Sequence, residues 1–230
     1  MQQQRFVSDA SHELRTPLTV ILGYSDMLSR WGREDRNILD EGITAIRSEA
    51  ENMQQLIEKL IFLARADQKR QAVNKERVDF AALLTDTMEK METVTRSHEI
   101  TLGRNDPAFV NADPVLLRQL LRIFLENSLK YTPEGGHIHA YSVLSPDGSA
   151  IVATLTDDGI GIAPEHQARI FDRFYRVDSS RTKETGGSGL GLSIARWIAE
   201  RHDIKITLRS AADEGTTIIL SIPIIRDKAA

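Results

Sequence analysis

The chain has 230 residues and a formal net charge of −4, with 41% hydrophobic and 27% charged residues. This composition is typical of a soluble globular protein, and the length suits two domains. The acidic balance, without a dense basic stripe, argues against a nucleic-acid-binding protein. Because the chain has no cysteine, disulfides and thiolate metal sites are excluded.

No apolar run approaches the roughly 18 residues that a membrane-spanning helix needs. The start, MQQQRF, lacks the basic and then apolar regions of a signal peptide. We therefore expect the chain to lie in the cytoplasm. Its first residues enter a helical pattern without Ser, Thr, Asp or Asn as a cap, so we expect it to be part of a longer protein.

Two long helices are predicted at the N-terminus. From about residue 36 to 66, apolar residues recur at spacings of four and three, which is an a/d seam over about four heptads. The seam consists of Leu39, Ile43, Ile46, Ala50, Met53, Ile57, Leu60 and Ala64. The preceding stretch places Leu14, Leu18, Ile21, Ser25 and Leu28 on one side. The short WGRED link carries Gly32, which suits a helix end, and so short a loop predicts an antiparallel hairpin.

A lone helical hairpin leaves much of its apolar seam in water. Pairing with a second copy into a four-helix bundle is the simplest way to bury this seam, so we expect a homodimer. A coiled-coil spacer is the alternative interpretation of the same pattern.

The helical spacing of apolar residues ends after the predicted hairpin. Polar, charged residues at 69–77 indicate a linker between a helical domain at 1–68 and a second domain at 78–226. In the second domain a helix follows Asp79, and a stronger one has Asp113 as N-cap and Pro114 at its first position. Alternating segments predict two β-hairpins, and a further helix follows the glycine-rich stretch. The predicted fold is thus a helical hairpin followed by a two-layer α+β sandwich, with a mostly antiparallel sheet and helices on one face.

The stretch ASHELRTPLTV in the first predicted helix combines a histidine, a glutamate and a proline. His12 lies two residues, or about 200°, from the inward Leu14, so it points to solvent, with Thr16 one turn further along the same face. Pro17 cannot donate its backbone nitrogen and is expected to bend the helix beside His12. An exposed neutral imidazole is a nucleophile if a carboxylate such as Glu13 takes up its proton. The alternative is an incidental surface histidine near a tolerated proline.

Three stretches of the second domain favour a nucleotide pocket. In TDDGIGI, Asp157 can accept a hydrogen bond from an exocyclic amine, and Gly159 and Gly161 let the backbone approach a flat ring. TGGSGLGLSI opens a helix, whose N-terminus attracts phosphate. ENSLKYT puts Asn127 and Lys130 on one helix face, as a Mg²⁺ ligand and a phosphate contact. The P-loop and Rossmann fingerprints both fail, because the residues after the glycines do not match them.

At these residues the chain resembles a known family. FVSDASHELRTPL is similar to the phospho-acceptor box of two-component sensor histidine kinases. The resemblance implies that His12 is phosphorylated, that Glu13 is the base, and that Thr16 positions the water that removes phosphate from a partner aspartate.

The second half resembles the Bergerat-type ATP-binding domain of these kinases, related to gyrase and MutL ATPases. The resemblance implies that ATP and Mg²⁺ are bound, with Asn127 as the metal ligand, Lys130 on phosphate, Tyr131 against the nucleotide and Asp157 on adenine. It also implies a mobile lid from about residue 172 to 187. The remaining implied contacts are Gly159, Gly161, Phe171, Phe174, Arg176, Gly187, Gly189, Leu190, Gly191 and Thr216.

One position departs from the family pattern. A second Asn usually stands four residues before the main one, where this chain has Ile123; gyrase-type relatives have a catalytic Glu there. Ile can neither activate water nor bind Mg²⁺, which argues against a hydrolytic ATPase. Either metal binding and autophosphorylation are weakened, or Ile123 is a core contact and one Asn suffices.

The implied function is ATP-dependent autophosphorylation on His12 and transfer to an aspartate of a response regulator, whose receiver domain is the expected partner. Thr16 suggests phosphatase activity toward the regulator as well. A phosphatase-dominant enzyme and a degenerate scaffold with weak nucleotide binding are the alternatives. Any membrane attachment is expected through segments outside this chain.

Overall fold

The computed structural model describes residues 2–32, 35–95, 97–177 and 187–225. The chain divides into two compact units, Met1–Gln71 and Ala72–Ala230. In the described residues, no helix has the length and apolar character needed to cross a bilayer.

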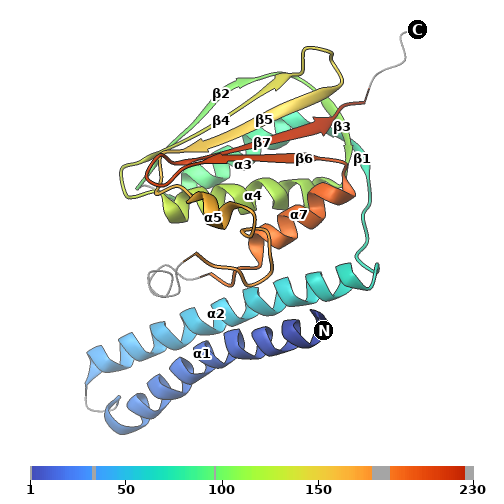
Figure 1. Cartoon of the computed structure of the whole chain (residues 1–230). Coiled ribbons are helices and arrows are strands. Elements are labelled where there is room, and N and C mark those ends of the chain that lie inside the picture. The colour runs from blue at the N-terminus through green and yellow to red at the C-terminus, as the bar shows by residue number, and fades with distance from the viewer. Residues whose placement is uncertain (1, 33–34, 96, 178–186, 226–230) are drawn as a thin grey trace. The chain divides into compact units, whose positions relative to one another are not determined.

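The first unit is a hairpin of two long helices, α1 (Gln2–Trp31) and α2 (Arg36–Asp67), which lie side by side (Figure 1). Helix α1 is continuous past Pro17. Asp35 caps α2, because its carboxylate accepts hydrogen bonds from the backbone nitrogens of Asn37 and Ile38. Gly42 lets the helices approach closely: a Cβ there would lie 2.6 Å from Cδ2 of Leu28. The predicted antiparallel hairpin is confirmed.

Helix α2 buries residues against α1 that the predicted seam did not include, and part of that seam is exposed, as expected for a single hairpin. Leu56, Leu63 and Ala66 are buried on α2, whereas Ile43 and Ile57 of the predicted seam are 52% and 42% exposed. On α1, the predicted inward Leu18 and Ser25 are exposed. The apolar stripe on α2 is wider than one helix contact can cover, so heptad spacing alone did not say which half faces α1.

The second unit is an α+β domain. Its helices are α3 (Phe80–Val94), α4 (Pro114–Tyr131), α5 (Pro164–Gln167) and α7 (Gly191–Arg201). Its strands are β1 (Glu76–Asp79), β2 (Glu99–Asn105), β3 (Phe109–Ala112), β4 (His137–Leu144), β5 (Ala150–Asp157), β6 (Lys205–Ser210) and β7 (Thr216–Pro223).

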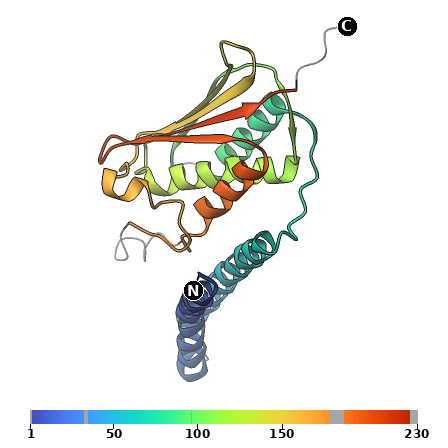
Figure 2. The same cartoon turned by 45° about the vertical axis from the view of Figure 1, so that its right-hand side comes forward.

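The main sheet has the strand order β2-β4-β5-β7-β6, and β1 and β3 form a separate antiparallel pair. Only the β2–β4 pairing of the main sheet is parallel. Helices α3, α4 and α7 cover one face of this sheet (Figures 1 and 2). The core lies between the two layers and includes Leu117, Leu120, Leu121, Ile138, Ile151, Leu155, Ile194 and Leu220. The predicted two-layer sandwich is confirmed.

Local signals located most of these elements. Asp113 caps α4 by accepting from the backbone nitrogens of Val115 and Leu116, with Pro114 at the first helical position, as predicted. Both β-hairpins are confirmed. The short β1, β2, β3 and α5 were not predicted, and the last two residues assigned to the linker lie in β1.

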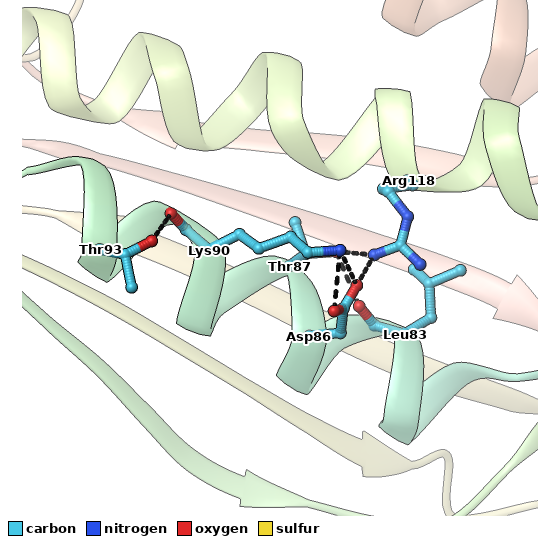
Figure 3. A network of polar contacts seen from close by, with 6 residues as sticks. All are labelled: Leu83, Asp86, Thr87, Lys90, Thr93 and Arg118. Atoms are coloured by element: carbon cyan, nitrogen blue, oxygen red, sulfur yellow. Dashed lines mark hydrogen bonds and ion pairs between the residues drawn. The ribbon is translucent and has the colours of Figure 1, made fainter.

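A polar network joins α3 to α4 (Figure 3). The Asp86 carboxylate lies between Lys90, whose Nζ is 2.9 Å from Oδ1, and the Arg118 guanidinium. The hydrogen bond from Lys90 leads the effects that lower the pKa of Asp86, with Arg118 adding to the shift. Thr87, beside this pair, donates its hydroxyl to the carbonyl of Leu83 at 2.7 Å. Since the charged groups are partly exposed, this network contributes modestly to the packing of the two helices.

His202 is a buried connection between α7 and α4. Its Nδ1 donates to the carbonyl of Ile198 at 2.8 Å, and its Nε2 accepts from the backbone nitrogen of Asp113 at 3.0 Å. Only the neutral imidazole can do both. Burial is the main cause that lowers the pKa of His202, with Lys75 acting in the same direction.

Acidification should therefore destabilise this domain through His202. The unfolded chain takes up a proton at about pH 6.5 while the folded chain does not, so the free energy of unfolding should fall below that pH. His202→Gln keeps an acceptor for Asp113 but cannot be protonated near neutral pH. Urea denaturation at several pH values should show a shallower acid dependence for His202→Gln than for the unmodified chain. Parallel curves for the two proteins would contradict this assignment.

Candidate functional site

The predicted site residues fall into two groups, one in each unit. His12, Glu13 and Thr16 lie on α1, and all the predicted nucleotide-binding residues lie in the α+β domain.

On α1, His12 and Thr16 are both exposed, whereas Glu13 is half-buried. Four-residue spacing puts the imidazole and the Thr16 hydroxyl on one face of the helix, one turn apart. Pro17 lies inside the same helix, one residue after Thr16, and has no N–H to donate along the helix. The arrangement therefore offers an accessible imidazole with a carboxylate on the adjacent residue.

The α+β domain contains a cavity of about 370 Å³, which is the size of a small-molecule site. Its walls come from the end of α4, the loop after β5, the segment before residue 178, the start of α7, and β6 and β7. The predicted residues on its walls are Asn127, Lys130, Tyr131, Asp157, Gly161, Arg176 and Thr216. The fold thus brings together seven residues from four separate segments of the sequence.

Asp157 is the buried polar centre of this cavity. Its Oδ2 accepts from the Ser128 hydroxyl at 2.7 Å, and its Oδ1 accepts from the backbone nitrogens of Gly159 and Thr216 at 3.2 and 3.1 Å. Burial is the main cause that raises the pKa of Asp157, and these three hydrogen bonds oppose it. The carboxylate is therefore held in one orientation from three segments and still borders the cavity.

The glycines after Asp157 sit where side chains do not fit. A Cβ at Gly159 would lie 2.6 Å from the carbonyl oxygen of Tyr131. Gly161 has φ +62°, and its Cβ would collide with the carbonyl of Ala211. Only glycine allows this close turn at the cavity wall.

The end of α4 supplies a positive charge. The Lys130 Nζ lies 4.8 Å from the ring centroid of Tyr131. A Cβ on Gly187 would collide with this Nζ, so the backbone of the glycine-rich segment lies close to the ammonium group. Asn127, one turn earlier on α4, also lines the cavity.

The segments on either side of the undescribed stretch 178–186 contact each other. The backbone nitrogen of Phe174 donates to the carbonyl of Gly189 at 3.0 Å, and both residues have positive φ. Seven predicted residues are not among those that line the cavity, namely Gly159, Phe171, Phe174, Gly187, Gly189, Leu190 and Gly191. Leu190 is fully buried and precedes α7, for which no described side chain forms a cap. Most of the predicted lid lies outside the described residues.

Several cavity residues were missed by sequence reasoning. Ser128, which holds Asp157, and Thr132 are polar; Thr132 Oγ1 is buried without a hydrogen-bond partner among the described residues. The apolar residues that were missed include Ile160, Ile162, Ile170, Leu192, Leu208 and Ile218. Thr132 stands in the KYT stretch and could have been singled out there, but the apolar residues resemble ordinary core positions.

Ile123 occupies a core position. It is 9% exposed, and its Cγ2 lies 3.5 Å from the position of a Cβ on Gly191. The side chain therefore packs between α4 and the start of α7, and it is not one of the residues lining the cavity.

Comparison with known proteins accounts for both units. The His Kinase A (phospho-acceptor) domain model matches residues 2–69, and the model of the histidine kinase-, DNA gyrase B- and HSP90-like ATPases matches residues 112–226. The chain belongs to the sensor histidine kinases. It is 37% identical to sensor histidine kinase YkoH of Bacillus subtilis over 219 residues, which are 95% of this chain and 47% of that protein.

A second relative of this histidine kinase is WalK of the same organism, 34% identical over 228 residues, or 97% of this chain and 37% of that protein. The chain thus spans less than half the length of these curated relatives. Among solved structures, histidine kinase ThkA in complex with response regulator protein TrrA has a TM-score of 0.74 at 21% identity, covering 98% of this chain and 63% of that one. This likeness supports the fold.

Replacing Ile123 by Asn should lower stability and leave nucleotide affinity unchanged. Burying an amide in this apolar contact is expected to reduce the free energy of unfolding by about 1–3 kcal/mol. Ile123→Val is the matched control and should cost about 0.5–1.5 kcal/mol. Urea denaturation measures the stability and calorimetric titration with Mg·ATP the affinity. Tighter binding by Ile123→Asn would instead mean that the departure at this position weakens metal binding.

Proposed function

We propose that this chain is the catalytic core of an ATP-dependent protein histidine kinase. It transfers the γ-phosphoryl group of ATP to His12 and then to an aspartate on the receiver domain of a response regulator. The single observation that carries the proposal is the pairing of an exposed His12 on a phospho-acceptor hairpin with a cavity centred on Asp157 in an ATPase-type domain. We propose residues 1–68, 69–77 and 78–226 as its functional divisions.

The cavity offers polar groups for both adenine and phosphate. Asp157, held by hydrogen bonds from three segments, is an acceptor for the exocyclic amine of adenine, and the Thr132 hydroxyl, which has no hydrogen-bond partner among the described residues, lines the same cavity. Lys130 and Arg176 supply positive charge for phosphate, and the N-terminus of α7 would attract phosphate as well. Gly159, Gly161, Gly187, Gly189, Leu190, Gly191 and Thr216 contribute backbone contacts, and Phe171 and Phe174 anchor the lid.

Magnesium fits this site through Asn127 rather than through a carboxylate cage. No group of three or more metal-ligating side chains occurs in the described ranges. Mg²⁺ keeps several waters and binds through substrate phosphates, so one amide oxygen is compatible with it. When bound, the ion neutralises phosphate charge during transfer.

At His12 the neutral imidazole nitrogen attacks the γ-phosphorus while the bond to the ADP oxygen breaks, and Glu13 takes up the imidazole proton. The phosphoramidate is reactive enough to pass the phosphoryl group to a carboxylate. Thr16 is exposed one turn away from His12. It would position a water molecule for phosphatase activity, the hydrolysis of the regulator's phosphoaspartate. The named regulator in the ThkA complex agrees with a receiver domain as the partner.

We further propose that the hairpin forms a homodimer. Val7, Leu18 and Leu22 on α1 and Ile43, Ile57 and Ile61 on α2 are exposed, although all are large apolar residues. A second hairpin packed on these stripes would give a four-helix bundle. We also propose that the chain lies in the cytoplasm, with any membrane attachment through segments outside it; the chain spans under half the length of its curated relatives.

Incubation with ATP labelled on the γ-phosphate tests the central claim. The chain should acquire an acid-labile, base-stable label, as expected of phosphohistidine, and His12→Gln should acquire none. Ser11→Ala, which changes the neighbouring hydroxyl, should be labelled like the unmodified chain. A label that persists in His12→Gln would refute the assignment.

Charge placed on the exposed apolar stripes should disrupt the dimer. Leu22→Glu or Ile57→Glu puts a carboxylate at a position that is exposed in one chain but buried in the proposed bundle, where an unpaired charge is costly. Sedimentation velocity should show dimer for the unmodified chain and for Asn52→Glu, exposed elsewhere on α2, and monomer for the two stripe variants. Equal masses for all four proteins would argue against this interface.

A further inference from the structure

The loop after β5 carries two successive aspartates that face different partners. Asp157 points to the cavity, with its hydrogen bonds to Ser128, Gly159 and Thr216. The Asp158 carboxylate instead contacts His137, the first residue of β4. One aspartate thus belongs to the nucleotide site, and the other attaches the same loop to the neighbouring strand.

The Asp158–His137 contact consists of three hydrogen bonds. The backbone nitrogen of His137 donates to Oδ1 and its Nδ1 donates to Oδ2, both at 2.7 Å. The backbone nitrogen of Asp158 donates in return to the carbonyl of His137 at 3.3 Å. Both carboxylate oxygens are used, which fixes the orientation of the group. Gly136 makes room for it, because a Cβ there would lie 2.8 Å from Oδ1 of Asp158.

The residues that follow Asp158 form part of the cavity wall. Ile160, Gly161 and Ile162 all line the cavity. The backbone nitrogen of Ile160 donates to the carbonyl of Tyr131 at 3.1 Å, so the loop also contacts the end of α4. A shift of Asp158 would therefore move both this wall and its contact with the segment that carries Lys130.

The charges around His137 strengthen the contact when the imidazole is protonated. The hydrogen bond with Asp158 is the main cause that raises the pKa of His137, and the carboxylate of Glu99 on β2, 3.6 Å from Nε2, adds to it. The same hydrogen bond leads the effects that lower the pKa of Asp158. Asp158 and Glu99 are the charged groups that the described structure places against this ring. The neutral imidazole still donates through Nδ1, so deprotonation weakens the contact without abolishing it.

We propose that His137 is a positioning residue for nucleotide binding, which holds the loop from Asp157 to Ile162 in its binding geometry through Asp158. The inference rests on the proposed function, since it assumes that the cavity takes ATP. His137 itself does not line the cavity and acts only through Asp158. The His137 ring is largely exposed, so water and salt weaken its attraction to Asp158. We therefore expect His137 to have only a modest effect on nucleotide affinity.

The test is the affinity of the full chain for ATP, measured by calorimetric titration from about pH 6 to about pH 9, a range that spans histidine titration. His137→Ala should weaken binding about two- to fivefold at the acid end, and the ratio to the unmodified chain should shrink as pH rises. ATP itself changes protonation over this pH range, but this affects both proteins equally. The ratio of the two affinities therefore removes it. His139→Ala is the matched control: it stands two residues along the same face of β4 and bonds Thr101 instead, so it should bind like the unmodified chain.

A double-mutant cycle separates positioning from general weakening of the strand. In an Asp158→Asn background, His137→Ala should produce little further loss of affinity, because the acceptor through which it acts is already altered. Should His137→Ala fail to fold, His137→Gln replaces it in the same cycle.

The outcomes distinguish this inference from the function on which it rests. An unmodified chain that binds no ATP overturns both. Normal binding by the unmodified chain, with equal affinity for His137→Ala and His139→Ala, overturns only the role of His137. An equal loss for His137→Ala with and without Asp158 likewise overturns it, whereas a pH-dependent loss that vanishes in the Asp158→Asn background supports it.

Discussion

The cavity of the α+β domain depends on one buried carboxylate. Asp157 ends a central strand, where its charge is costly unless hydrogen bonds compensate. Ser128 of α4, Gly159 of the following loop and Thr216 of β7 supply them. The same three bonds therefore stabilise the charge and hold a helix, a loop and a strand at fixed positions. The carboxylate that borders the cavity thus also organises its own surroundings.

The loop after Asp157 both lines the cavity and attaches to the neighbouring strand β4. Consecutive residues leave the end of β5 on different sides, so Asp157 turns inward and Asp158 turns toward β4. Gly159 and Gly161 then bring the backbone back to the cavity without steric conflict. The contact of Asp158 with His137 is exposed, whereas Asp157 is buried, so the two contacts can vary independently.

The sequence predicted the elements whose signals are local. Asp79 and Asp113 as helix caps, and the alternating segments of both hairpins, need only a few neighbouring residues to be recognised. The short β2 escaped prediction because Gly103 and Arg104 interrupt its pattern, and its pairing with β4 is set by distant contacts. Ile160, Leu208 and Ile218 were missed as cavity residues for a related reason: only tertiary packing distinguishes a cavity wall from a core. Likewise, Leu56, Leu63 and Ala66 were missed as buried residues of α2, because periodicity locates a stripe and not the neighbour that covers it.

The two outer strands of the main sheet carry charge. Lys205 and Arg209 are exposed on β6, and Glu99 and Arg104 are exposed on β2. Charged side chains on an outer strand discourage another chain from adding to the sheet through its backbone. Self-association by strand addition is thereby disfavoured at both ends of the sheet. The large apolar residues that are exposed on the helical hairpin, such as Leu22 and Ile43, thus remain as a surface on which copies of the chain can associate.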